Sequence, residues 1–228
     1  MTCEISAPNA KDIKRLRIML AAEKMFAEKG YHKTTVEHIA KAAGIGKSTF
    51  YEYFASKDEV LRTAVDMGVN NFLEILQVEY KKCTTTKAKV FATIYCCLLV
   101  SGVHGDALQA YIPLAMHNTA VGFSDYFKQK FAQPFFGIMR NIFVGGMNSG
   151  EIAEQDADLL VHMLMGCVGS AIHYQCSVAT PSEYPDILEL TDCKEAMAKI
   201  QQSDFHKVCS KTAAEITELF WRGVGKNK

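Results

Sequence analysis

Gly46-Lys47-Ser48 is the stretch whose residue types most directly suggest chemistry, because it matches the last three positions of the phosphate-binding loop GxxxxGK[ST]. The first glycine of that loop would fall at position 41, which is Lys41. A Cβ at that position obstructs the backbone amides that must wrap around a phosphate. The loop also has to follow a β-strand, and no segment here alternates with the period of a strand. We therefore predict that this stretch is not the nucleotide site of an NTPase.

Two histidine–cysteine pairs could instead bind a metal, since His173 and Cys176, and His206 and Cys209, each stand one helical turn apart. Nothing in the sequence marks a fourth ligand, so we predict no metal site and no cofactor. A site that senses metal or thiol oxidation remains the alternative. The eight cysteines form no CxxC pair and most lie in apolar helical runs, which favours reduced, buried thiols.

Catalytic motifs are missing, because the sequence contains no GxSxG, no HExxH and no glycine-rich cofactor loop. We expect no catalytic residues and no enzyme. The net charge is zero, but residues 1–62 carry 11 Lys and Arg against 8 Asp and Glu, whereas residues 63–228 carry 14 against 17. This asymmetry points to an anionic partner for the N-terminal segment alone.

Residues 159–182 form a long stretch without Asp, Glu, Lys or Arg. Its length would suffice to cross a bilayer, but it contains His162, His173, Gln175 and Pro181 and has no Lys or Arg anchor nearby. A buried helix explains it better. We predict no membrane association, and because nothing resembles a signal peptide, a cytoplasmic location.

The elements that carry these residues are all expected to be helices, because apolar side chains repeat at three and four residues almost throughout. Thr34 with Glu37, and Ser56 with Glu59, have the spacing of capping boxes and mark two helix starts. The all-α fold comprises helices at about 11–29, 35–43, 47–53, 56–82, 87–103, 106–118, 121–148, 155–178 and 203–222, with a loop at 178–188.

The helices at 35–43 and 47–53 are joined by Gly44-Ile45-Gly46, as in a helix-turn-helix. The second helix would expose lysine, hydroxyl and tyrosine side chains that suit a DNA major groove: Lys47, Ser48, Thr49, Tyr51 and Tyr53. Phe50 is open to two interpretations, core packing or base contact, and Tyr53 to packing or phosphate contact. We expect Glu52 to point away from phosphates or to accept from a cytosine amino group.

The run from Ala21 to Leu61, AAEKMFAEKGYHKTTVEHIAKAAGIGKSTFYEYFASKDEVL, resembles the N-terminal domain of TetR-family transcriptional regulators. The resemblance implies a two-fold dimer that places one recognition helix per subunit in successive major grooves of a pseudo-palindromic operator on double-stranded DNA. It also implies phosphate contacts where the second and fourth helices begin. The complete predicted DNA-binding set is Thr35, Lys47, Ser48, Thr49, Phe50, Tyr51, Tyr53 and Lys57. Four basic residues nearer the N-terminus either reach DNA or form a solvated face: Lys11, Lys14, Arg15 and Arg17.

Residues 63–228 are predicted to form a helical ligand-sensing and dimerisation domain, after a DNA-binding domain at 1–62. Aromatic and methionine side chains there would line an apolar cavity, with histidines as orienting polar groups. The candidate ligand contacts are His104, Met116, His117, Phe123, Phe127, Met139, Phe143 and His173. In the family, the last two long helices form a four-helix bundle in the homodimer, here the helices at 155–178 and 203–222.

These observations predict a ligand-responsive, sequence-specific DNA-binding regulator. In this family the regulator is most often a repressor, and we expect a small, largely apolar effector to release it from its operator. The rival from another class is a helical ligand-binding protein without DNA affinity.

Overall fold

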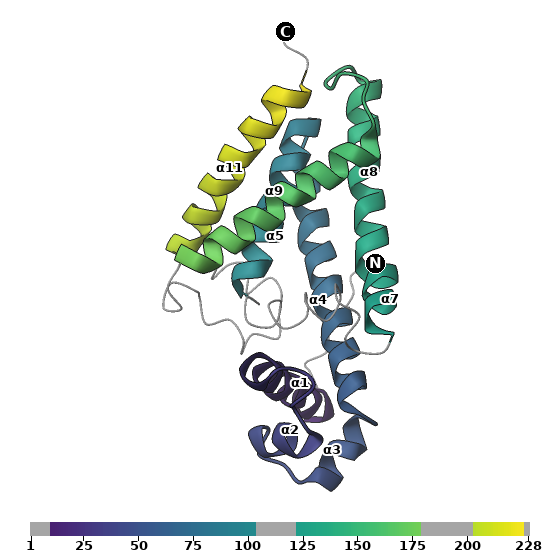
Figure 1. Ribbon diagram of the computed structural model, residues 1–228, viewed down its shortest axis with the longest axis vertical. Coiled ribbons are helices and arrows are strands. Elements are labelled where there is room, and N and C mark those ends of the chain that lie inside the picture. The colour runs from purple at the N-terminus through teal and green to yellow at the C-terminus, as the bar shows by residue number, and fades with distance from the viewer. Residues whose placement is uncertain (1–9, 104–121, 179–202, 226–228) are drawn as a thin grey trace. The chain divides into compact units, whose positions relative to one another are not determined.

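The computed structural model describes residues 10–103, 122–178 and 203–225, and every extended regular element within these ranges is a helix (Figure 1). One isolated antiparallel bridge, between Ile152 and Gly225, is the only pairing of strand type there. The predicted all-α class is therefore confirmed. Among the helices in these ranges, none is both long enough and apolar enough to cross a membrane.

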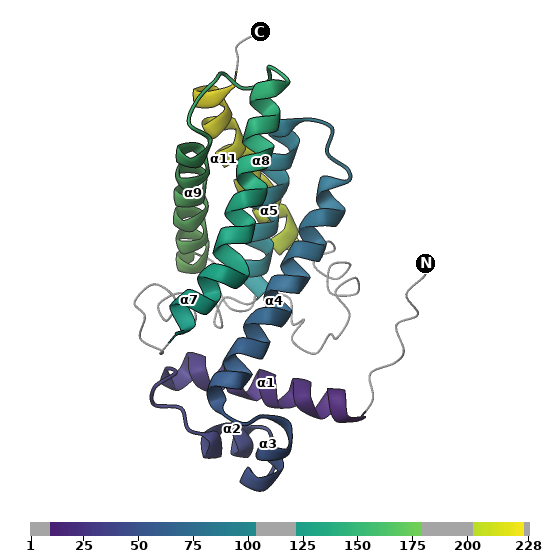
Figure 2. The same cartoon turned by 90° about the vertical axis from the view of Figure 1, so that its right-hand side faces the viewer.

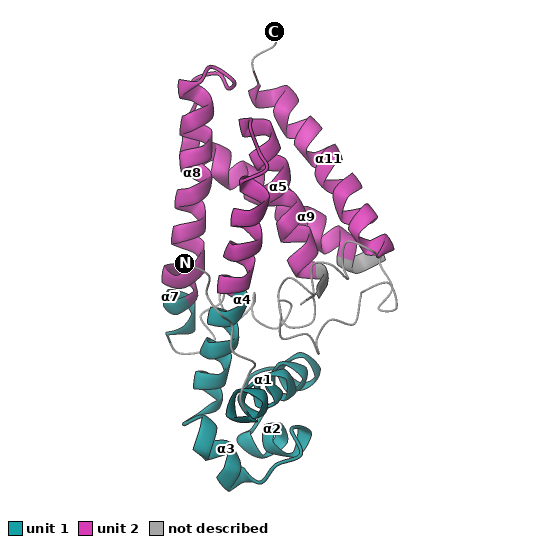
Figure 3. Cartoon of the chain, turned by 180° about the vertical axis from the view of Figure 1, so that it is seen from behind, with its two compact units in different colours: residues 1–68, 106–126 teal, residues 69–105, 127–228 magenta. Residues whose placement is uncertain are grey.

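The chain divides into two compact units, one of residues 1–68 and 106–126 and the other of residues 69–105 and 127–228 (Figure 3). Helix α4 (Lys57–Tyr80) contributes to both, because the division falls after Gly68. The predicted border at residue 62 lies a short way before this point, on the same helix.

The first unit contains α1 (Ala10–Lys29), α2 (Val36–Ala42), α3 (Lys47–Tyr53) and the beginning of α4 (Figure 2). Helix α1 buries Ile18, Ala22 and Phe26 on one face, at the spacing of an amphipathic helix, and ends at Gly30, whose φ of 77° is left-handed. The expected bounds of these helices agree with the observed ones to within a few residues.

The capping box at the start of α2 is shifted by one residue from the prediction. Thr35, not Thr34, is the N-cap, and its hydroxyl accepts from the backbone N–H of His38 at 3.3 Å while His38 Nδ1 accepts from the Thr35 N–H. Thr34 is instead buried and donates to the carbonyl of Met25 or Gly30. At α4, the Ser56 hydroxyl accepts from the Glu59 N–H as expected, but the Glu59 carboxylate accepts from Ala55 N rather than Ser56 N.

The second unit packs α5 (Thr86–Val103) against α8 (Gln133–Asn148), α9 (Ala157–Val178) and α11 (Asp204–Val224) (Figures 1 and 2). The core between them is made of fully buried aliphatic and aromatic side chains, including Val90, Ile94, Leu98, Phe135, Met139, Phe143 and Leu164. The uncharged stretch that begins at Leu159 is helix α9 as far as Val178, and it buries one face in this core, with Leu160, Leu164 and Val168.

The single helix expected at 121–148 is divided into α7 (Phe123–Phe127), a π-helical segment η1 (Lys128–Ala132) and α8. The N–H of Gln133 donates to the carbonyl of Lys128, which is five residues earlier, as in a π-helix. Pro134 follows at once and has no N–H to continue the α-helical ladder, which favours this break. The helix expected at 106–118 and the loop at 178–188 lie, apart from Val178, outside the described residues.

Candidate nucleic-acid interface

The turn between α2 and α3 is closed by backbone hydrogen bonds from Gly44 N to Lys41 O, at 3.1 Å, and from Ile45 N to Ala40 O, at 2.9 Å. Gly44 adopts φ 67°, a left-handed conformation that side chains with a Cβ rarely take. A Cβ there would also lie 2.9 Å from Nη2 of Arg17. The glycine thus lets two seven-residue helices meet at a sharp angle, with Ile39 and Ala40 fully or almost fully buried between them.

Phe50 is 0% exposed, so the structure corrects its assignment to the DNA-binding set. Its ring packs beside those of Tyr51 and Phe54, with centroids 5.6 and 6.1 Å apart. In a helix the same face returns after three to four residues, and Phe50 and Phe54 therefore form the inner stripe of this segment. Phe50 positions the helix instead of reading bases.

The opposite face of α3 is exposed and polar, as the recognition helix of a helix-turn-helix must be. Lys47, Ser48 and Glu52 are exposed, and Tyr51 has half of its surface accessible. Thr49 and Tyr53 are partly buried. The ammonium and hydroxyl groups among them can donate to base edges or phosphates, whereas the Glu52 carboxylate can only accept, and all these DNA contacts remain predictions.

Lys47 is already engaged on the protein, because its ammonium forms an ion pair with Glu37 on α2. The hydrogen bond between the two groups raises the pKa of Lys47 and lowers the pKa of Glu37. Both side chains are more than half exposed, so the pair lies at the surface where water screens it. A DNA phosphate or base would have to compete with the Glu37 carboxylate for Lys47. The sequence patterns did not predict this ion pair.

Lys57 was predicted to contact phosphate, but its ammonium lies inside the first unit. It donates to the carbonyls of Tyr31 at 2.8 Å and Thr34 at 2.9 Å, and it stands 4.4 Å above the ring of Tyr31. Burial lowers its pKa. The Tyr31 hydroxyl in turn donates to Asp58. Lys57 therefore holds the connection between α1 and α2 onto the first turn of α4, and its phosphate contact remains a prediction that this geometry does not favour.

The candidate ligand contacts are not brought together around one cavity by the described residues. Met139 and Phe143 are 0% exposed in the packed core, where Phe143 lies against Phe220 with ring centroids 5.8 Å apart. Phe123 is buried and Phe127 partly buried. His173 is exposed, because α9 turns Ala171 and Gln175 inward instead, so it lines no cavity formed by the described residues. Three further candidates lie outside the described residues: His104, Met116 and His117.

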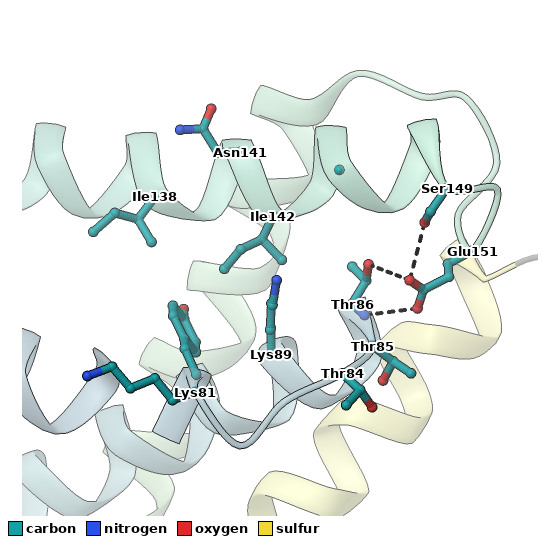
Figure 4. A pocket seen from close by; sticks show the side chains of 12 residues that line it. Lys81, Thr84, Thr85, Thr86, Lys89, Ile138, Asn141, Ile142, Ser149 and Glu151 are labelled. Atoms are coloured by element: carbon teal, nitrogen blue, oxygen red, sulfur yellow. Dashed lines mark hydrogen bonds between the residues drawn. The ribbon is translucent and has the colours of Figure 1, made fainter. Parts of the chain in front are cut away.

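A cleft of about 610 Å³ that the sequence did not reveal lies in the second unit, between the end of α4, the start of α5 and α8 (Figure 4). Ile138 and Ile142 form its apolar wall, and Lys81 and Lys89 extend from its other side. Neither ammonium has a hydrogen bond or an ion pair with another described residue. A wall of this kind with two free cations can hold an anionic amphiphile.

The carboxylate of Glu151 at the end of this cleft is already satisfied. It accepts from the backbone N–H of Thr86 at 2.9 Å, from the Thr86 hydroxyl at 3.1 Å and from the Ser149 hydroxyl at 3.2 Å (Figure 4). It thereby caps α5 at the end where free N–H groups need an acceptor. The run of threonines at 84–86 between lysines was the sequence signal that could have pointed to this cleft.

A family model described as "Bacterial regulatory proteins, tetR family" matches residues 18–64, which span the helix-turn-helix and the start of α4. The fatty acid metabolism regulator protein of Bacillus subtilis is 29% identical over 164 residues, which are 70% of this chain and 81% of that protein. Residues 18–64 therefore form a TetR-family DNA-binding domain. The chain is a ligand-responsive, DNA-binding transcriptional regulator, as the sequence predicted.

Solved structures of TetR-type regulators share the fold over nearly the whole chain. The ketosteroid regulator KstR2 of Mycobacterium tuberculosis superposes with a TM-score of 0.69 at 18% identity, covering 94% of this chain and 96% of that one. FadR of Bacillus subtilis, solved with stearoyl-CoA, has a TM-score of 0.64 at 20% identity over 89% and 97% of the two chains. Two further curated relatives match over only 38% and 25% of their own lengths. At these identities the solved structures establish the fold of this chain, while effector and operator remain to be proposed.

Proposed function

We propose that this chain is a TetR-family repressor that binds a pseudo-palindromic operator as a homodimer and leaves it when an acyl effector binds. The observation that best supports DNA binding is the exposed polar face of α3. The buried Phe50 on the opposite side of this helix anchors it in the first unit. Such a helix at the surface of a helix-turn-helix fits a major groove, and one copy per subunit reads one half-site.

Dimerisation is supported by apolar side chains that α9 and α11 leave in solvent. Leu159, Met163 and Tyr174 on α9, and Val208 and Leu219 on α11, are each more than half exposed. On each helix the spacing of these residues places them on one face. In addition, α9 has no charged residue after Asp158. A soluble chain gains most by covering such surface with a second copy.

For the effector, we propose a long-chain fatty acyl thioester. Support comes from the similarity to the Bacillus subtilis fatty acid metabolism regulator over most of both chains. The cleft of α4, α5 and α8 fits the chemistry, since an acyl thioester of coenzyme A combines an apolar chain with phosphates that Lys81 and Lys89 could neutralise.

The test is a mobility-shift assay on duplexes from the DNA flanking the chain's own coding region. Stearoyl-CoA should release the protein from a duplex that it binds specifically, whereas free coenzyme A at the same concentration should not. Lys89→Gln should raise the stearoyl-CoA concentration needed, and Lys87→Gln, whose lysine pairs with Glu218, is the matched control. Retention on DNA at saturating acyl-CoA of every chain length would refute the effector class, and equal release in both variants would exclude the cleft.

The metal- or thiol-sensing alternative gains no support from the described residues. Within them no three His, Cys, Asp or Glu side chains cluster as a metal site would require. His206 Nδ1 lies 2.6 Å from the Tyr95 hydroxyl, while Cys209 accepts from Gln175. Burial raises the pKa of the Cys209 thiol to about 11, which suppresses the thiolate needed for oxidation. The side chain of Cys176 lies outside the described residues.

A further inference from the structure

Arg15 lies on α1, and its guanidinium contacts the end of the recognition helix and the beginning of α4 at once. Nη1 donates to the carbonyl of Tyr53, the last residue of α3, at 2.9 Å. Nη2 donates to the Thr63 hydroxyl at 3.5 Å and lies 3.9 Å from Oε1 of Glu59. The guanidinium carbon stands 4.2 Å from the centre of the Phe54 ring. All these partners belong to the first unit.

The contact with Tyr53 matters because α3 has little stability of its own. It is seven residues long, and its N-cap, Gly46, offers no side chain to bond the first amides. The last carbonyls of a helix lack partners within the helix and carry its negative dipole end, so a cation placed there is favourable. Arg15 supplies that cation and bonds the final carbonyl directly.

The same side chain joins α3 to two other helices through a fixed geometry. A guanidinium is planar and directs its donors in a rigid fork, whereas a lysine ammonium is a mobile point charge that cannot stack and donate in two directions in this way. Both terminal nitrogens of Arg15 face protein partners, and the residue is only partly exposed. Because 38% of the side-chain surface is accessible, a phosphate contact is the competing role, and it predicts different behaviour of the variants.

We propose that Arg15 is a positioning residue for sequence-specific DNA recognition, which fixes the C-terminal end of α3 to α1 and to the first two turns of α4. It acts through α3 and not through a phosphate of its own. The proposal rests on DNA binding by α3, as proposed above. Because α4 continues into the second unit, Arg15 also makes the end of α3 follow any displacement of the first turns of α4.

The experiment compares two duplexes: one enriched by in vitro selection with the wild-type protein, and a scrambled duplex of equal length and composition. Dissociation constants are measured by fluorescence anisotropy over a range of salt concentrations for the wild type, Arg15→Lys and Arg15→Gln. Lys24→Gln is the matched control, since it removes a positive charge from an exposed residue of the same helix.

Both Arg15 variants should bind the selected duplex about tenfold more weakly, the effect of losing one charge-assisted hydrogen bond. Their binding to the scrambled duplex and their salt slopes should stay close to those of the wild type. A phosphate contact predicts something different: Arg15→Lys restores binding, while Arg15→Gln weakens both duplexes and makes the salt slope shallower by about 0.9. That pattern, or wild-type affinity of both variants for the selected duplex, would overturn the proposal.

Folding is monitored separately, by calorimetry and by titration of the binding-competent fraction. If Arg15→Gln does not fold, Thr63→Val is the second variant, because it removes one partner of the guanidinium and keeps every charge. It should lower the affinity for the selected duplex by about twofold to threefold and leave the affinity for the scrambled duplex unchanged. Equal affinity of Thr63→Val and wild type would then count against the proposal. If the wild type enriches no duplex at all, the proposed function itself fails, which is a different result from a failure of Arg15.

Discussion

Phe50→Ala is expected to unfold the helix-turn-helix locally, because the ring is fully buried and not part of the DNA-facing surface. Truncating a buried phenylalanine to alanine costs about 3–5 kcal/mol, through lost transfer free energy and the cavity left behind. Small domains are stable by only about 5–15 kcal/mol, so this is a large part of the total. With a urea dependence of about 1–3 kcal/mol per molar, the midpoint of the first unit should fall by at least about 1 M.

The assay has to report on the first unit. Trp221, the sole tryptophan, lies on α11 in the second unit, so its fluorescence would follow the wrong transition. Amide hydrogen exchange of α2 and α3, measured by mass spectrometry at a series of urea concentrations, reports the unfolding of the first unit.

Tyr51→Ala is the matched control for Phe50→Ala, because Tyr51 is the neighbouring aromatic residue on the exposed face of α3. It should change stability by no more than about 0.5 kcal/mol while weakening DNA binding. An unchanged exchange profile of Phe50→Ala, together with lost DNA affinity, would show that the Phe50 ring faces DNA and that the packing described here is wrong.

Four further outcomes are expected. Glu37→Gln should free Lys47 and strengthen binding to selected and scrambled duplexes alike in mobility shifts at low salt, and unchanged affinity would mean that Lys47 does not meet DNA. Gly44→Ala should destabilise the first unit by about 1–2 kcal/mol in hydrogen exchange, the cost of a left-handed alanine, and no change would contradict the turn geometry. Leu219→Glu should give monomers in light scattering, and an intact dimer would place the interface elsewhere. The folded pKa of Cys209, about 11, exceeds its ordinary 9.0, so the stability that it contributes is complete below pH 9 and is lost as pH rises to about 11. Cys209→Ala should lessen this alkaline loss in Trp221-detected unfolding, and identical pH profiles would argue against a buried thiol.

The sequence predicted best where local rules decide the outcome. The bounds of α3, the turn at Gly44 and the Ser56 cap follow from residues within a few positions of one another. Side-chain contacts were predicted less well where the hydrogen-bond partner lies far away in the sequence. Lys57 bonds the carbonyls of residues more than twenty positions earlier, and Arg15 bonds Tyr53 across thirty-eight positions. The sequence therefore predicted a DNA contact for Lys57 near a helix start, but it could not predict the bonds of Lys57 to these carbonyls.

Two other differences have physical causes of the same kind. At the start of α2 either of two adjacent threonines could serve as the cap, and burial of Thr34 left that role to Thr35. The cleft of α4, α5 and α8 could not be read from periodicity, because its wall and its lysines are contributed by segments about fifty residues apart. Ile138 and Ile142 have the spacing of core residues, and only the packing of the helices shows which part of that face remains uncovered.

The π-helical segment η1 keeps a series of three aromatic rings of the second unit in contact. Along an α-helix of 3.6 residues per turn, every fourth residue advances about 40° beyond a full turn, so a repeat of four drifts around the axis. A π-helical turn contains more residues, so each residue rotates less about the axis and the drift is reduced. Phe127, Phe131 and Phe135 consequently stay aligned through the break, with successive centroids 5.3 and 5.2 Å apart, and the last pair is nearly parallel at 10°. Phe72 of α4 meets the rings of Phe131 and Phe135 edge-on, so the extra residue of the π turn sets how this helix packs against α4.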